Sequence, residues 1–131
     1  MGLIPEQHQN ILKSVAFAHI ATVGPDGSPQ SSPVWFDWDG TYLRFGHTRK
    51  GQKFHNLQRE PRVALSILDP ENAYHYLELR GKVIKIEDDT DNHFVNAMAK
   101  RYMGLDVYPY RQPTDQGIIV TIKPEHFTAM G

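Results

Sequence analysis

The chain has 131 residues, of which 40% are hydrophobic, and its 14 Lys and Arg against 15 Asp and Glu give a formal net charge of -1. The absence of cysteine excludes disulfides, thiolate metal sites and thiol nucleophiles. No basic excess favours nucleic acid or an anionic membrane, and no apolar run approaches the ~20 residues of a membrane helix. We therefore expect one cytoplasmic domain with neither kind of partner.

The hydrophobic pattern predicts mainly short strands joined by tight turns. Apolar runs bounded by Gly, Pro, Asn and Asp predict strands over residues 17–23, 30–37, 42–47, 62–68, 74–87 and 118–123. The first three should form a meander, because short loops favour antiparallel neighbours. Gly81 marks a predicted bulge in the fifth strand.

Three helices complete the expected elements, over residues 5–14, 51–59 and from Thr90 as N-cap to Gly104 as C-cap. About six antiparallel strands with minor α structure favour a mainly β, split β-barrel fold over a parallel α/β sheet.

The segment between the third strand and the second helix is the most informative for binding. It contains Thr48, Arg49, Lys50, Gly51, Gln52 and Lys53. Free N–H groups at a helix start, a hydroxyl and three cations are suited to a phosphate, and a glycine permits close approach to the backbone. The alternative is a solvated basic turn, since the segment matches neither a P-loop nor a Rossmann fingerprint.

Two further segments allow a binding or a purely structural interpretation. Pro33 in the strand over 30–37 predicts an edge or bulged strand with free backbone groups, in which Trp35 and Phe36 point to opposite faces. In the fifth strand, Tyr74 and Tyr76 share a face with an acid and a base, which suits a dimer interface or a cofactor wall. The alternatives are an ordinary edge strand and a solvated face.

The loop over residues 108–111 (YPYR) could cover the mouth of a pocket, although packing is the favoured interpretation. Seven histidines raise the possibility of a metal, but their spacing forms neither HxxxH nor HExxH, so no metal site is expected. No GxSxG elbow is present for hydrolysis, and no catalytic residue is assigned.

Taken together, these segments resemble the pyridoxamine 5'-phosphate oxidase-like superfamily, and within it the class B flavin/deazaflavin-dependent oxidoreductases, called probable F-420-dependent enzymes. The resemblance is carried by residues 21–29 (ATVGPDGSP), 32–36 (SPVWF), Lys53 with Asn56-Leu57, 59–64 (REPRVA), 76–81 (YLELRG) and 108–111.

The resemblance implies a split-barrel homodimer with two cofactor sites at the subunit interface. It implies that Ser32, Pro33, Val34 and Trp35 flank the cofactor ring, that residues 48–53 and Asn56 belong to the phosphate region, and that Tyr74 and Tyr76 come from the opposite subunit. Such proteins usually bind coenzyme F-420, while some relatives take FMN and others haem.

The resemblance therefore predicts a coenzyme F-420-dependent oxidoreductase that transfers a hydride to a small-molecule acceptor. The alternatives are an FMN-binding oxidoreductase on the same fold, a non-catalytic carrier of the cofactor, and a structural homodimer with an empty site. Oxidation of pyridoxamine phosphate itself is not expected, because the classical oxidase has a longer C-terminal segment and this sequence stops at Gly131.

Overall fold

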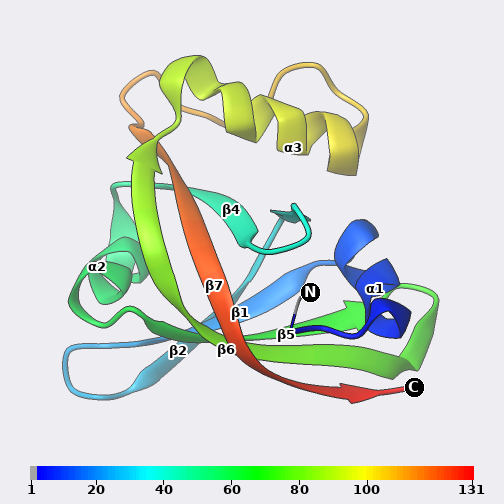
Figure 1. Ribbon diagram of the computed structural model, residues 1–131. Helices are drawn as coiled ribbons and strands as arrows, with labels where there is room; N and C mark the ends of the chain where they lie inside the picture. The colour runs from blue at the N-terminus through cyan, green and yellow to red at the C-terminus, as the bar shows by residue number, and fades with distance from the viewer. Residues whose placement is uncertain (1–2) are drawn as a thin grey trace.

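Seven strands form one antiparallel sheet in the order β2-β1-β5-β6-β7-β4-β3, in a computed structural model that describes residues 3–131. The sheet curls into a half-barrel, which confirms the predicted split-barrel class (Figure 1). The strands are β1 (Ala18–Val23), β2 (Pro29–Val34), β3 (Phe36–Trp38), β4 (Leu43–Thr48), β5 (Arg62–Asp69), β6 (Asn72–Asp88) and β7 (Gly117–Met130).

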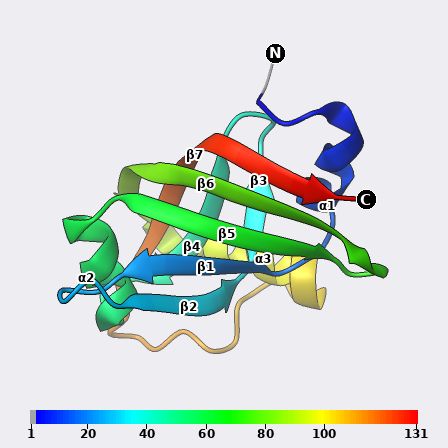
Figure 2. The same cartoon turned by 90° about the horizontal axis from the view of Figure 1, so that it is seen from below.

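Helices lie around the curled sheet rather than in a separate layer (Figures 1 and 2). They are η1 (Glu6–His8), α1 (Gln9–Lys13), α2 (Gly51–Arg59), η2 (Thr90–Asn92) and α3 (His93–Met103). Helix α2 has the predicted bounds, and α3 crosses the open end of the sheet at the top of Figure 1. The helix predicted over 5–14 is a 3-10 turn followed by the five-residue α1.

The segment over 30–37 is not one strand, and the prediction of a three-strand meander is wrong. β2 pairs with β1, whereas β3 pairs with β4, so the two segments lie at opposite edges of the sheet. Trp35 is the single residue between them. The two edges of the sheet must therefore converge at Trp35, which makes this residue the seam of the split barrel.

The last strand is longer than the predicted 118–123, because β7 continues past Pro124 to Met130 along β6. The register of this pair shifts between Arg80 and Gly81, as the predicted bulge requires. A Cβ on Gly81 would lie 2.1 Å from the carbonyl oxygen of Lys123. Only glycine therefore allows the two long strands to cross this closely.

The core fills the concave side of the sheet. Residues alternate between buried and exposed along β5, where Val63, Leu65 and Ile67 point inward. Other fully buried side chains include Phe36, Leu43, Phe45, Leu77, Leu79, Ile118, Val120 and Ile122.

Helix α3 begins differently from the prediction that Thr90 is its N-cap. The Asp89 carboxylate accepts the backbone N–H groups of Phe94 at 2.7 Å and Val95 at 2.9 Å, across the intervening turn of η2. Gly104 ends the helix at φ 73°, as predicted. Asp89 thus fixes the helix over the end of the sheet, where it forms one wall of a cavity.

Candidate cofactor site

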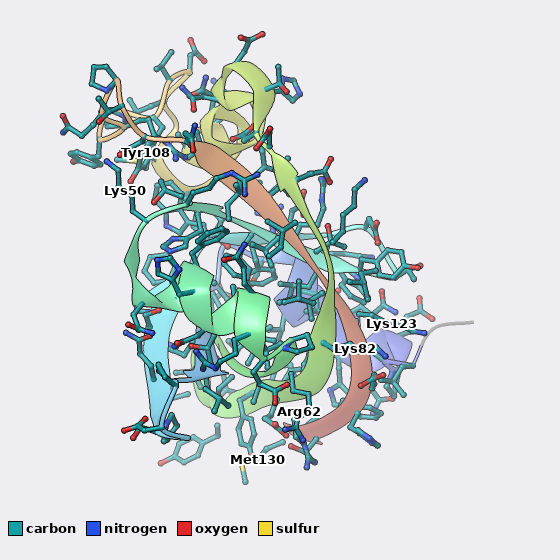
Figure 3. All side chains as sticks on the ribbon, turned by 90° about the vertical axis from the view of Figure 1, so that its left-hand side faces the viewer. Lys50, Arg62, Lys82, Tyr108, Lys123 and Met130 are labelled. Atoms are coloured by element: carbon teal, nitrogen blue, oxygen red, sulfur yellow. The ribbon has the colours of Figure 1, made fainter. Side chains whose placement is uncertain are left out.

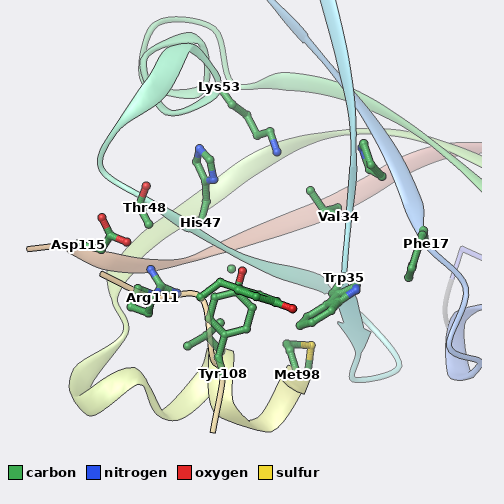
Figure 4. Close-up of a pocket in the computed structure, with 14 residues that line it drawn as sticks. Phe17, Val34, Trp35, His47, Thr48, Lys53, Met98, Tyr108, Arg111 and Asp115 are labelled. Carbon is green, nitrogen blue, oxygen red and sulfur yellow. The ribbon is translucent and has the colours of Figure 1, made fainter. Parts of the chain in front are cut away.

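A cavity of about 360 Å³ lies between the seam at Trp35, the end of β4, helix α3 and the loop over residues 105–116 (Figure 4). This volume is within the range typical of small-molecule sites. Figure 3 shows that Lys50 and Tyr108 mark this end of the molecule, whereas Met130 lies at the opposite end. The cavity has one cationic wall and one aromatic wall.

Lys53 reaches into the cavity from the first turn of α2 (Figure 4). Burial lowers the pKa of its ammonium group, because charge is disfavoured away from water. Its Nζ lies 5.8 Å from the centre of the Phe45 ring, and no carboxylate of residues 3–131 forms an ion pair with it. A half-buried cation without an ion-pair partner is suited to an anionic ligand.

Arg111 provides a second cation from the loop that follows α3. Its Nε and Nη1 atoms are buried and lack a hydrogen-bond partner within residues 3–131. A Cβ on Gly117 would lie 3.1 Å from Nη1 of Arg111. Glycine at position 117 therefore leaves room for the guanidinium group. Because buried donors are nearly always paired in folded proteins, these unpartnered atoms indicate a ligand.

His47 lies beside these cations near the end of β4. Burial, together with the charges of Lys53 and Arg111, lowers the pKa of its imidazole to about 4. Its Nε2 atom is also buried without a partner in the described chain. The ring is therefore neutral at neutral pH and has one free hydrogen-bonding position.

The other two cations of the basic segment point elsewhere. Arg49 pairs with Asp88 at 2.6 Å, and Lys50 pairs with Asp115 at 2.7 Å. Thr48 lines the cavity, and its Oγ1 accepts a long hydrogen bond of 3.4 Å from the Lys50 backbone. Only one of the three predicted cations thus faces the cavity.

Aromatic side chains form the opposite wall. The Trp35 indole stacks on Tyr102 with ring centroids 5.1 Å apart and planes at 10°, and the edge of Tyr108 meets it at 5.8 Å. The Tyr102 hydroxyl donates to the Ala16 carbonyl at 2.7 Å and accepts the Phe36 N–H at 3.2 Å. These bonds fix Tyr102, and thereby the indole that faces the cavity.

Comparison with known families decides what kind of protein has this cavity. Residues 4–130 match the pyridoxamine 5'-phosphate oxidase family. The chain belongs to this family. Membership confirms the resemblance inferred from the sequence and supports an oxidoreductase that uses a flavin-type cofactor.

Solved structures of family-like proteins agree with this fold. A protein named F420 Reductase is 40% identical, with a TM-score of 0.86 over 95% of this chain and 98% of its own. The conserved hypothetical protein Rv2991 from Mycobacterium tuberculosis is 23% identical, with a TM-score of 0.76 over 98% and 85%. General Stress Protein 26 from Bacillus anthracis is 21% identical, with a TM-score of 0.70 over 95% and 92%. None of the curated proteins searched matches the chain.

Five of the predicted binding residues of this family member line the cavity: Pro33, Val34, Trp35, Thr48 and Lys53. Ser32 precedes them on the edge strand β2 but is not part of the wall. Gly51 begins α2 at φ 88°, a backbone conformation that favours glycine, and it is not part of the cavity wall.

Asn56 and Gln52 belong to a structural network instead of the cavity wall. Asn56 is fully buried, and its amide donates to Thr22 Oγ1 at 3.0 Å and Gln30 Oε1 at 3.2 Å. Gln52 donates to Asn56 Oδ1 at 2.8 Å. These bonds hold α2 against β1 and β2.

Tyr74 and Tyr76 do not line the cavity of their own chain. Tyr74 is 79% exposed near the turn between β5 and β6. Tyr76 pairs with Leu68 on one side and Met130 on the other, at the end of the molecule opposite to α3 (Figure 3).

Sequence reasoning missed part of the cavity wall. The residues that it did not assign to binding are Phe17, Gly46, His47, Val95, Met98, Tyr108, Tyr110, Arg111 and Asp115. The loop over 108–111 does cover the cavity, contrary to the favoured interpretation as packing alone. His47 was considered only as a metal ligand, and no cluster of three metal-binding side chains occurs within residues 3–131.

The described part of the chain also has no helix that is both long and apolar enough to span a membrane.

Proposed function

We propose that this protein is a coenzyme F-420-dependent oxidoreductase that transfers a hydride to a small-molecule acceptor. The observation that supports it most is a cavity in which Arg111 and His47 offer unpartnered buried polar atoms beside the stacked Trp35, together with the half-buried cation of Lys53. A cofactor with an anionic group at one end and a flat ring at the other would match that arrangement. The name of the 40% identical relative, F420 Reductase, favours the deazaflavin.

The residues of the chain would bind and orient the cofactor. Lys53 and Arg111 attract its phosphoryl group, because charge-assisted hydrogen bonds are stronger in a site from which water is excluded. Val34 and Trp35 pack against the ring, and the loop carrying Tyr108 limits access of water. When bound, the reduced deazaflavin supplies the hydride.

A second copy of the chain would complete the site. Leu68, Tyr76 and Met130 are cross-strand neighbours in β5, β6 and β7, and Leu68 and Met130 are 46% and 51% exposed. With Tyr74 they form an apolar surface at the end of the sheet. We propose that this surface enters a homodimer interface in which Tyr74 and Tyr76 approach the partner's cofactor. Sedimentation of the wild type and of Tyr74→Ala tests this: a monomeric wild type contradicts it.

Hydride transfer is tested by mixing the protein with reduced coenzyme F-420 and a series of quinones, enones and tetrapyrroles, and following the return of the oxidised chromophore. Oxidation of the cofactor that occurs only when the protein is present supports the proposal that the protein is an enzyme. Tight binding without turnover of any acceptor would instead indicate a carrier.

The choice between coenzyme F-420 and FMN needs a separate titration, since both ligands carry a phosphoryl group beside a ribityl chain. Equilibrium titration of the apoprotein with each ligand should give the lower dissociation constant for coenzyme F-420. A lower constant for FMN would favour an FMN-dependent oxidoreductase on the same fold.

A further inference from the structure

The imidazole of His47 occupies a position that binding of an anion should change. It lies near the end of β4, and Figure 4 shows it on the same side of the cavity as Thr48 and Lys53, with Arg111 across from it. Its Nε2 atom is buried and has no partner in the described residues. Because His47 lines this end of the cavity, a ligand bound there would lie beside its ring.

The charged groups of the protein that act on His47 are mainly positive. Lys53 faces it from α2 and Arg111 from the loop after α3, and both disfavour a positive ring. Asp115 also lines the cavity, and its carboxylate pairs with Lys50 at 2.7 Å and interacts with the charge of Arg111, so the three cations still outnumber it. The other elements contribute the apolar Val95 and Met98 from α3, and Ile118 of β7, which pairs with His47.

A phosphoryl group would reverse this balance. Its oxygens only accept hydrogen bonds, so Nε2 must carry the proton of either the neutral Nε2–H tautomer or the imidazolium to bond with them. Its negative charge also offsets the repulsion from the two cations, and an anion within ~4–6 Å favours the charged form of a base.

We propose that His47 takes up a proton from solvent when the anionic end of a ligand binds between Lys53 and Arg111. The protonated ring then donates from Nε2 to the anion as a third positive group. This inference rests on the proposed function, because it assumes that the cationic end of the cavity receives the cofactor's phosphoryl group. It makes His47 a binding residue whose charge depends on the ligand.

Linkage gives a reciprocal consequence for affinity. If the ligand raises the proton affinity of His47, a proton on His47 raises the affinity for the ligand by the same factor. The dissociation constant should therefore fall as the pH is lowered through the pKa of His47 in the complex, and should level off below its pKa of about 4 in the free protein. A ring that stayed neutral in both states would give no such contribution.

The direct test is NMR titration of the imidazole C–H signals of the whole protein, with and without saturating coenzyme F-420. The signal of His47 is identified by its absence in His47→Gln. We expect its pKa, about 4 in the free protein, to rise by ~1 pH unit or more on binding, a roughly tenfold gain in proton affinity. The exposed His55, identified with His55→Gln, should show no comparable change.

The second test compares the dissociation constants of wild type and His47→Gln at each pH, so that ionisation of the ligand itself cancels. The wild type should gain affinity toward low pH relative to the variant. Tight binding that depends on Lys53, with an unchanged His47 signal, would overturn this inference and leave the proposed function intact. Failure of both coenzyme F-420 and FMN to bind would overturn both.

Discussion

The Nζ atom of Lys50 lies 2.7 Å from Oδ1 of Asp115, which ties the turn before α2 to the loop that covers the cavity. Asp115 is largely buried in this pair, whereas Lys50 is 59% exposed. The hydrogen bond from the Arg49 backbone to the Gln116 carbonyl, 3.1 Å long, reinforces the same junction. Lys50 is therefore occupied within the protein, although sequence alone predicts a phosphate ligand.

We expect Lys50→Ala to lower the free energy of unfolding by less than about 1 kcal/mol, as is typical of partly exposed ion pairs. Its effect on coenzyme F-420 affinity should be smaller than that of Lys53→Ala, because Lys50 already has a counter-charge. Urea unfolding and ligand titration measure the two effects. Equal losses of affinity in the two variants would place Lys50 at the ligand.

Asn56 should matter for stability and not for binding. Asn56→Ala removes the amide that joins α2 to Thr22 and Gln30, and leaves the buried Thr22 hydroxyl without this partner. We expect the free energy of unfolding to fall by about 1–3 kcal/mol. Affinity measured under conditions where the variant is fully folded should be unchanged. If the variant folds but no longer binds coenzyme F-420, Asn56 contacts the ligand directly, as the family resemblance implies.

A substitution at Gly81 tests how closely β6 and β7 must approach each other where they cross. A methyl group there would meet the Lys123 carbonyl oxygen and the Pro124 Cα, both within 3.0 Å. Gly81→Ala should destabilise the fold by about 3 kcal/mol, the upper end for an overpacked site. The adjacent exposed variant Lys82→Ala is the control in urea unfolding. Similar stability of both variants would show that the strands separate without cost.

Local signals predicted the parts of the fold that local interactions determine. The bounds of α2 follow from Gly51 at its start and Pro61 after it, and Gly81 alone indicated the bulge. The break at Trp35 was not predictable in this way, because the residues on either side pair with different and distant strands. The polar character of residues 124–126 likewise concealed the second half of β7.

The candidate site, too, was predictable only where local sequence determines it. A run of cations after a strand was recognisable, but the partners of Arg49 and Lys50 lie 39 and 65 residues further along the chain. Local charge alone does not distinguish Lys53 from them, whereas the family resemblance, carried in part by Lys53 with Asn56-Leu57, does. Local charge does not identify Arg111 either, which reaches the cavity only because α3 and its following loop fold over the end of the sheet.

His47 also predicts how stability depends on pH. Burial and neighbouring cations lower its pKa from 6.5 to about 4, so between these values the unfolded chain binds more protons than the folded protein. The contribution of the neutral ring to the free energy of unfolding is complete above pH 6.5 and is lost as the pH falls through about 4. Urea unfolding over this range should show a steeper loss for wild type than for His47→Gln. Parallel curves would contradict a buried, neutral His47.

The central claim is that Lys53 anchors the anionic end of a redox cofactor, and titration of coenzyme F-420 into wild type, Lys53→Ala and Lys82→Ala tests it most directly. Lys82 is a cation of β6, outside the cavity (Figure 3). We predict that Lys53→Ala weakens binding by about 1.5–3 kcal/mol, which is roughly tenfold to 150-fold, while Lys82→Ala binds as the wild type does. Unchanged affinity in Lys53→Ala would contradict the account.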